Sequence, residues 1–413
     1  MRLGPRLECA RHAPCSARGK MDKTLRKRCR ATFSPALPVS FALLAVLSSR
    51  AAAQAPAPGP SPTPVPAAAP APAPKWYEEI DVHGMVSAAY SYNTNRPDSG
   101  LNQYRVFDFQ DNTFRLDVAE LTVMKNAAKP GEAGFRVDAE AGSTIPQVSA
   151  SYGLFQGQDF DLKQAFVTWV APLGSGLKID FGKFISHFNY EYIESWDTLN
   201  DNSTHSFTFG YAIPYAHTGF RLGYAFSDQW AALVMLVNGW DDVKDNNSSK
   251  SVGAQVTWTP VKALSVAANL MTGPERPDVN ANPRTVWELV GQWKLSDLTV
   301  FGLDLLYAYE RGAVVPGQTA TWASVVGYAR LGVSGLFAVC LRAEYFDDAD
   351  GARTGVAQRL RELTLTPEFR VSSHFLFRAD FRVDWSNVAS FEKKGGATSK
   401  TQPTVNVNAI YLF

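Results

Sequence analysis

The stretch that decides the fold is Thr404-Val405-Asn406-Val407-Asn408-Ala409-Ile410-Tyr411-Leu412-Phe413. Apolar side chains occupy every second position from Val405 to Phe413, and polar ones alternate with them until Ile410 and Leu412. A period of two is that of a β-strand with one apolar and one polar face. The ends of soluble domains are usually solvated and frayed, so a strand that stops on an aromatic residue indicates the closing strand of a sheet.

The same alternation recurs upstream. From Phe375 to Trp385 every odd position is apolar and nearly every even position is charged, and Phe135 to Ala141 follows the same rule. After Ile80 there is no run of 18 apolar residues and no long helical periodicity. The sequence therefore predicts an all-β protein, either a soluble sandwich with its apolar faces on a core or a membrane barrel with those faces on lipid.

Connection lengths favour the barrel. Links after the odd-numbered strands are long and polar, as in 93–111, 241–250 and 387–402, whereas those after the even-numbered strands are short, as in 172–175, 227–228, 296–297 and 372–373. We place strands near 80–92, 112–125, 133–142, 161–171, 176–187, 208–225, 229–239, 251–259, 264–273, 284–295, 298–309, 320–332, 335–346, 358–370, 374–386 and 403–413. The prediction is a transmembrane antiparallel β-barrel of about 16 strands, with 14 or 18 as alternatives, short periplasmic turns and long extracellular loops. Closure is required because an open edge in hydrocarbon leaves backbone groups unpaired.

The first 78 residues differ from the rest. Residues 1–53 combine a basic region, an apolar run from Ala36 to Leu47 and the small residues Ala51-Ala52-Ala53, which is the pattern of a secretory signal peptide. Met21 is an alternative start. Residues 54–78 are rich in Ala and Pro and predict an extended periplasmic linker, and residues 79–413 form the barrel.

Cleavage after Ala53 changes the charge and the cysteine content. It leaves 29 basic and 37 acidic residues, so the mature chain is acidic, which argues against a nucleic-acid partner. Only Cys340 remains of the four cysteines, which excludes an intrachain disulfide and a cysteine-based metal site.

Short motifs between Phe181 and Trp240 carry a resemblance to a known family. They are Gly182-Lys183-Phe184, Tyr190-Glu191, His217-Thr218-Gly219 and Asn238-Gly239-Trp240. In this order and spacing the chain resembles the putative β-barrel porin-2 family, the OmpL-like porins, over most of residues 80–413. Where that family has Pro and Gly after Gly-Lys-Phe, this chain has His187 and Phe188. The resemblance implies an outer-membrane channel without catalytic residues, and it implies that Tyr411 and Phe413 serve as the signal for the barrel-assembly machinery.

Strand parity, which is the odd or even position of a residue relative to the apolar face of its strand, predicts which side chains face the lumen. The candidates lie opposite the apolar face of their strands and are Arg136, Asp138, Glu140, Glu288, Lys294, Asp304, Arg342, Glu344, Glu362, Glu368, Arg378, Asp380, Arg382 and Asp384. On this basis Phe381→Arg should hinder folding, whereas Arg382→Glu should be tolerated. Lys183 shares the parity of Phe181, so a bulge or a strand-end position is needed to keep its charge out of lipid. Trp169, Trp230, Trp258, Trp287, Trp293 and Trp385 lie towards strand ends, as interfacial girdle residues do.

The predicted function is a porin for passive diffusion of small hydrophilic solutes or ions, integral to the bacterial outer membrane. The alternative is a plugged structural or adhesive barrel that acts through its loops or linker. We expect no enzyme, cofactor or metal site, although the acidic loops at 241–245 and 347–350 could hold calcium. A hydrolase built from His187 or His205 with Asp197, Asp201 or Ser203 is the weakest alternative. Expected partners are outer-membrane lipid, lipopolysaccharide and the assembly machinery, and a homo-oligomer is left open.

Overall fold

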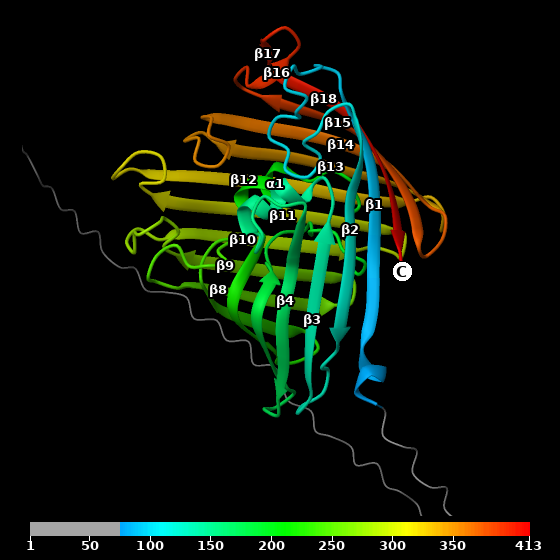
Figure 1. The fold of residues 1–413 in the computed structure, drawn as a ribbon, viewed down its shortest axis with the longest axis vertical. Coiled ribbons are helices and arrows are strands. Elements are labelled where there is room, and N and C mark those ends of the chain that lie inside the picture. Colours follow the sequence, from blue (N-terminus) through cyan, green and yellow to red (C-terminus); the bar gives the residue numbers. More distant parts are fainter. Residues whose placement is uncertain (1–74) are drawn as a thin grey trace, which may run out of the picture. The chain divides into compact units, whose positions relative to one another are not determined.

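The computed structural model describes residues 75–413, and within them the strands form one closed antiparallel barrel in which β1 pairs with β18 (Figure 1). The predicted signal peptide and residues 54–74 of the predicted linker lie outside the described residues. A short 3-10 helix, η1 (Trp76–Glu79), precedes the first strand. None of the helices in residues 75–413 has the length and apolar character needed to span a membrane.

Sixteen strands make up the wall within these residues, which confirms the predicted number. They are β1 (Asp81–Asn93), β2 (Thr113–Lys125), β3 (Ala133–Ala141), β4 (Phe160–Ala171), β5 (Leu177–Ile185), β6 (Ala216–Ala225), β7 (Trp230–Val237), β8 (Ser251–Val261), β9 (Leu264–Gly273), β10 (Arg284–Lys294), β11 (Thr299–Arg311), β12 (Thr319–Gly332), β13 (Phe337–Asp348), β14 (Gln358–Arg370), β15 (Phe375–Ser386) and β18 (Thr401–Leu412). The remaining elements are α1 (Ile145–Tyr152), the π-helix η2 (Thr208–Ala212) and a hairpin of β16 (Phe391–Lys393) and β17 (Ala397–Ser399).

One predicted strand is too long. The strand expected over 208–225 begins only at Ala216, and residues 208–212 form η2 instead. Thr208, Phe209 and Ala212 are all buried. A wall strand would expose every second side chain. Because these three side chains are buried together, the stretch is surrounded by protein and is not part of the wall.

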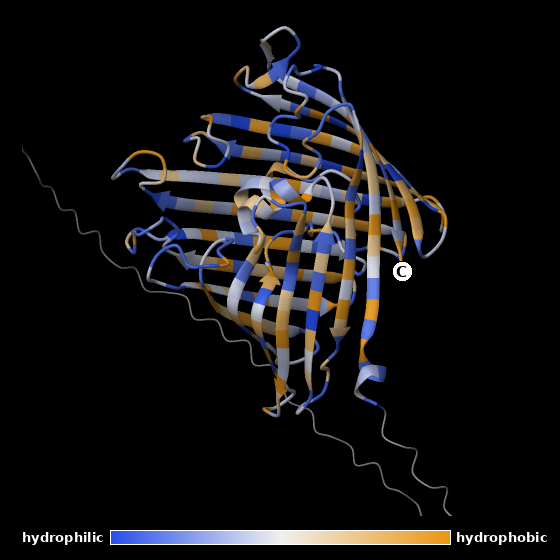
Figure 2. Cartoon of the chain, viewed as in Figure 1, coloured by the Kyte–Doolittle hydropathy of each residue, from blue (hydrophilic) through white to orange (hydrophobic). Residues whose placement is uncertain are grey.

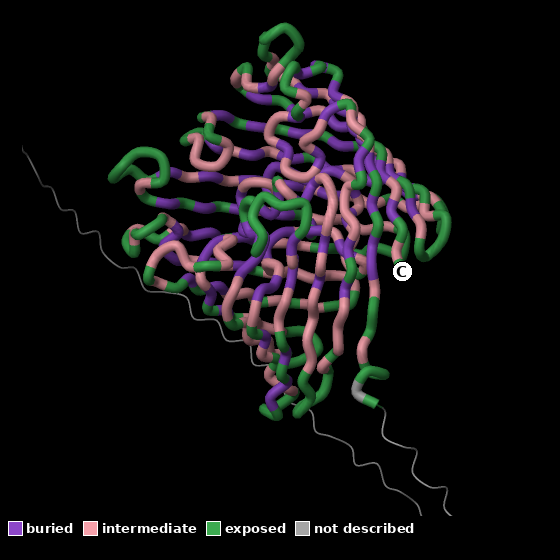
Figure 3. The backbone as a smooth tube through the Cα atoms, viewed as in Figure 1, coloured by how far each residue is buried: buried purple, intermediate pink, exposed green. Residues whose placement is uncertain are grey.

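Inward and outward positions alternate along the wall, as Figures 2 and 3 show for hydropathy and burial. In β15 the side chains of Phe377, Phe381 and Trp385 are exposed, whereas the charged residues between them are buried. All six tryptophans of the predicted girdle point outward, with 38 to 53% of their surface exposed. The apolar outer face is the one that hydrocarbon can cover.

The exception in the closing strand has a packing cause. Ile410 and Leu412 occupy inward positions that elsewhere in β18 carry polar residues. Ile410 is fully buried and packs in a small apolar cluster with Met85 and Leu376, to which Leu199 and Leu412 also belong. Because Leu199 comes from the chain between β5 and β6, the break in alternation marks where that chain touches the inside of the wall.

A glycine pair turns Lys183 inward. Gly182 has a φ of 139° and faces Gly219, whose φ is 157°. The amine of Lys183 lies 2.9 Å from the Asp161 carboxylate and over the ring of Tyr152, and Lys183 is 6% exposed. The local change of backbone direction at the glycines removes the parity conflict, and the charge stays out of lipid.

A charge on the outer face should be costly. We expect Phe381→Arg to lower the yield of folded barrel in liposomes, because Phe381 is half exposed in the middle of β15 and an arginine near the bilayer midplane costs roughly 2–4 kcal/mol. Phe381→Leu is the matched control and should fold like the unchanged chain. The folding yields are measured by heat-modifiable mobility on gels. Equal yields for the two variants would contradict the assignment of Phe381 to the face that contacts lipid.

Candidate functional site

Residues 186–215, between β5 and β6, fold into the interior of the barrel, and we call them the inner segment. Ile185 and Ala216, which flank it, are paired in the sheet, so the segment leaves and rejoins the wall at one point. Its side chains Phe207 and Phe209 are almost fully buried. The connection predicted as an outer loop is therefore largely part of the barrel's filling.

Four predicted lumen carboxylates hold the backbone of the inner segment. Each accepts hydrogen bonds from its N–H groups: Glu288 from Asn189 at 2.9 Å, Asp304 from Tyr190 at 3.1 Å, Asp380 from Ser203 and Thr204 at 3.1 and 2.7 Å, and Glu344 from Phe207 and Thr208 at 2.7 and 2.6 Å. A buried backbone N–H group needs a hydrogen-bond acceptor. An irregular backbone has no regular pairing with a neighbouring strand that would supply a carbonyl oxygen. Carboxylates on β10, β11, β15 and β13 are the acceptors here, which fixes the segment across the barrel.

Three predicted arginines hold the same segment. Their contacts are Arg342 with the Glu191 carboxylate at 2.5 Å, Arg378 with the Glu194 carboxylate at 2.7 Å, and Arg382 with the carbonyl oxygen of His205. Arginine suits this task because its planar guanidinium offers several donors and stays charged when buried. Each arginine also contacts its own wall, so the segment and the wall share one network of charges.

Arg382 is an ion-pair partner of buried carboxylates as well as a charge on the inward face of the wall. Its Nε lies 2.7 Å from Asp384 and 3.4 Å from Glu362, both fully or almost fully buried, and its guanidinium packs 4.9 Å from the ring centre of Phe207. Sequence parity expects Arg382→Glu to be tolerated, but in this position a third carboxylate would face two others without water. The exchange leaves uncompensated buried charge, which is strongly destabilising.

The other seven predicted lumen residues form side-chain contacts, some of them with these anchors and with the inner segment. Their contacts are Arg136 with Asp138 at 2.9 Å and with Asp197 at 2.7 Å, Glu140 with the Tyr152 hydroxyl at 3.1 Å, Glu362 with Arg342 at 2.7 Å, Glu368 with Arg330 at 2.6 Å, and Asp384 with Arg105 at 2.7 Å. Lys294 differs from all of them, since it is exposed at the short-turn end of β10 and pairs with Asp297 at 3.0 Å. Thirteen of the fourteen are therefore buried or half-buried.

Sequence parity missed inward residues that stand next to bulges. Asp138 pairs with Gln164 and Ala139 with Leu162, so Lys163 is an extra residue in β4. It is fully buried against the Glu120 carboxylate. The signal was present in the sequence as a break in the alternation at Lys163-Gln164, but alternation alone does not say to which side the extra residue turns.

The family motifs meet at the two ends of the inner segment. Gly182, Lys183 and Phe184 pair directly with Gly219, Thr218 and His217 across β5 and β6. The Ser186 hydroxyl lies 3.1 Å from Nε2 of His217, whose Nδ1 lies 3.1 Å from the carbonyl oxygen of Gly239. Because that carbonyl can only accept, Nδ1 carries the proton, and in the neutral ring Nε2 then accepts from Ser186. These motifs thus fix the entry and exit of the segment.

The interior holds both a dry core and water-sized space. Phe184, Phe207, Trp240, Trp322 and other apolar residues form a buried cluster around η2. Two cavities of about 310 and 200 Å³ lie beside the start of the inner segment and share Tyr190, Tyr192 and Gln292 in their walls. Gln292 is near the short-turn end of β10, so both cavities reach towards the short turns of the wall.

Several carboxylates of the acidic loops bind groups of the protein itself. Asp241 accepts the backbone N–H of Ala216 at 3.0 Å, Asp245 pairs with Lys250, and Asp350 accepts the N–H of Thr321. Burial raises the pKa of Asp241, and likewise that of Glu275 in the loop after β9, to about 7. Among residues 75–413 no three His, Cys, Asp or Glu side chains are arranged to hold a metal ion.

Two of the hydrolase candidates, His205 and Ser203, are engaged elsewhere. The ring nitrogen Nε2 of His205 lies 3.1 Å from the carbonyl oxygen of Tyr192, and the hydroxyl of Ser203 accepts a hydrogen bond from Asn406 at 2.6 Å. A nucleophile needs its base within hydrogen-bond reach. Both groups instead fasten the inner segment to itself and to β18.

Solved structures of outer-membrane channels share this fold. An anion-selective porin from Comamonas acidovorans aligns with a TM-score of 0.55 at 13% identity, over 81% of this chain and 99% of the porin. The outer membrane channel DcaP of Acinetobacter baumannii gives 0.56 at 12%, over 81% and 97%. The trimer form of OmpT from Vibrio cholerae gives 0.50 at 13%, over 81% and 99%. At such identities the likeness concerns the fold, and no curated protein matches the sequence.

A family model covers the whole barrel. Residues 79–413 match the model described as putative beta-barrel porin-2, OmpL-like. The match includes every strand of the wall and the motifs that flank the inner segment. With a closed wall that is apolar outside and polar within, this chain belongs to the OmpL-like porin-2 family and is an outer-membrane channel protein.

Proposed function

We propose that the barrel conducts small hydrophilic solutes and ions by passive diffusion along a path narrowed by the inner segment. The observation that carries this proposal is the inward face of the wall, where charged and amide side chains replace the apolar residues of the outer face. Such a surface favours water inside a sixteen-strand barrel. Seven of the fourteen predicted lumen residues, the four carboxylates and three arginines described above, set the position of the inner segment. Arg136 and Lys294 keep contact with solvent.

The second candidate is a plugged structural barrel. The apolar cluster around η2 and the dense ion pairs favour it, because they fill the interior with protein. Under this alternative the long loops or the Ala/Pro-rich linker would bind partners and nothing would pass.

The two candidates differ in one measurement. We expect purified barrel in a planar bilayer to show stepwise KCl currents that are smaller than those of an unobstructed sixteen-strand barrel. Folded, heat-modifiable protein that inserts without any current would overturn diffusion and favour the plugged barrel. A buffer-only preparation carried through the same detergent is the control for leaks.

Several further expectations belong to this proposal. The chain is exported through a signal peptide cut after Ala53, and its Tyr411 and Phe413 are read by the assembly machinery. Lipid and lipopolysaccharide surround the outer face. A homo-oligomer is also proposed, since the OmpT structure that shares the fold is a trimer form.

A further inference from the structure

The larger interior cavity differs from the rest of the barrel in its charge. It measures about 310 Å³ and lies between residues 186–192 and the strands β8, β9 and β10. Its walls contain no Asp, Glu, Lys or Arg side chain. In an interior held together by ion pairs, this is a neutral compartment. Any charged solute that rests in it gives up water without meeting an opposite charge, which is unfavourable.

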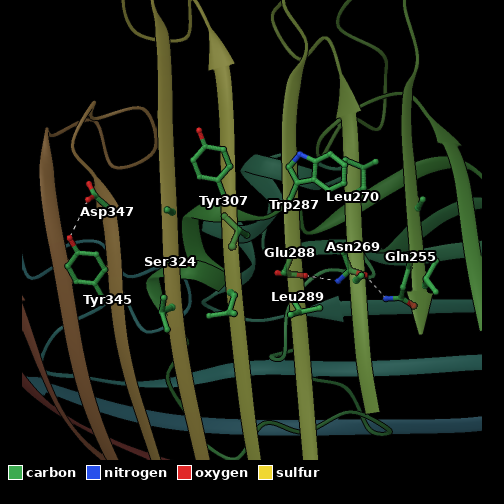
Figure 4. A pocket seen from close by; sticks show the side chains of 17 residues that line it. Gln255, Asn269, Leu270, Trp287, Glu288, Leu289, Tyr307, Ser324, Tyr345 and Asp347 are labelled. Carbon is green, nitrogen blue, oxygen red and sulfur yellow. Dashed lines mark hydrogen bonds between the residues drawn. The ribbon is translucent and has the colours of Figure 1, made fainter. Parts of the chain in front are cut away.

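Neutral hydrogen-bonding groups line this compartment. Gln255 donates to Asn269 at 2.9 Å, and Asn269 donates to Glu288 at 2.7 Å, which forms a row across three neighbouring strands. Figure 4 shows these three side chains together with the lining of a different pocket, which includes Trp287 and Tyr307. The row fixes the orientation of both amides. Towards the short-turn end the lining also includes the hydroxyl of Ser265 and the amide of Gln292, a residue that is exposed to solvent. Amides and hydroxyls both donate and accept, so they match a ligand that is rich in hydroxyl groups.

Aromatic rings complete the lining. Tyr190 is held in place by stacking on Tyr328, with ring centres 4.3 Å apart. Tyr192 lines both cavities and keeps 47% of its surface exposed. A tyrosine ring offers an apolar face together with a polar tip. The C–H face of a sugar ring can pack on the former while its hydroxyls reach the neighbouring amides.

We propose that this compartment is a binding subsite for a neutral sugar of monosaccharide size, which gives the channel a preference among hydrophilic solutes. The inference rests on the proposed function, because it names the class of solute that the pathway favours. The volume is at the lower end of that of small-molecule sites. A site built from oriented hydrogen-bonding groups discriminates well against solutes that lack matching groups.

The test compares glucose with gluconate, which has similar size but carries a negative charge. Liposomes containing the barrel should swell faster in glucose than in gluconate. Glucose should also reduce the KCl current in a saturable manner, and it should show saturation-transfer NMR signals with the barrel in detergent micelles. Tyr192→Ala should raise the half-saturating glucose concentration roughly fivefold. Gln292→Leu should act in the same direction, and it tests the subsite independently if Tyr192→Ala fails to fold.

The matched control is Tyr307→Ala, since Tyr307 is 51% exposed on the outer face of β11. It should leave glucose binding unchanged. A barrel that conducts KCl without a saturable effect of glucose overturns the sugar subsite alone. The same conclusion follows if the half-saturating glucose concentration is equal for the unchanged chain and for both lining variants. A folded barrel without KCl current overturns diffusion instead, and the NMR measurement then decides the subsite without conduction.

Discussion

Replacing residues 186–215 with a four-residue Gly-Ser turn is expected to raise the single-channel conductance several-fold. The design is feasible because Ile185 and Ala216 are directly paired in the sheet, so a tight turn can join them. Removal takes out both the apolar contacts of Phe207 and the polypeptide that crosses the interior. A sixteen-strand barrel without filling leaves an aqueous channel. The wall charges that remain, such as Arg342, would then be hydrated in a wider lumen.

The control for this deletion is the same Gly-Ser turn in place of residues 313–316, in the loop between β11 and β12. Val314 and Val315 are exposed there, so the conductance should not change. Glu344→Gln is a milder variant for the case that the deletion does not fold. It weakens the hold on Phe207 and Thr208 and should increase current noise. An unchanged conductance in the folded deletion variant would show that the inner segment is not the restriction.

Phe413→Ala is expected to abolish most assembly into the outer membrane while leaving refolding of the purified chain in detergent nearly normal. Phe413 exchanges two backbone hydrogen bonds with Gly84, at 2.9 and 3.0 Å, which the variant keeps. Its ring is 53% exposed and lies over Gly84, where a Cβ would come within 2.3 Å of it. Loss of a half-exposed ring costs the barrel only about 1–2 kcal/mol, so a large defect in cells points to recognition and not to stability.

Phe369→Ala provides the matched control. Phe369 is also 53% exposed and lies near the short-turn end of β14, so the variant removes an equivalent ring from a different strand. Quantitative blots of outer-membrane fractions should show normal amounts of it. Equal assembly of Phe413→Ala and Phe369→Ala would contradict the role of Phe413 as an assembly signal. If Phe413→Ala also failed to refold in detergent, Phe413 would have a structural role instead.

Alternation along each strand was enough to predict the wall. The period of two in 375–385 and 404–413 depends only on neighbouring residues, because a strand places successive side chains on opposite faces wherever it lies. Loop lengths then determined the even strand number and the direction of each strand. Arg378, Asp380 and Asp384, which alternation places opposite the apolar face, are buried in the structure.

The tertiary structure alone decided what fills the barrel. Residues 208–212 read as the start of a strand, yet the space inside a closed wall lets them form a buried helical turn. Glu344, Asp380 and Arg342 look like free lumen charges in the sequence, but each is occupied by the inner segment at a separation of more than 130 residues. Periodicity predicts the two faces of one strand at a time. The position of the inner segment depends instead on contacts between residues far apart in the sequence, which meet only after the barrel has closed. The sequence by itself therefore determined the wall and its two faces, and the folded chain decided the width and lining of the interior.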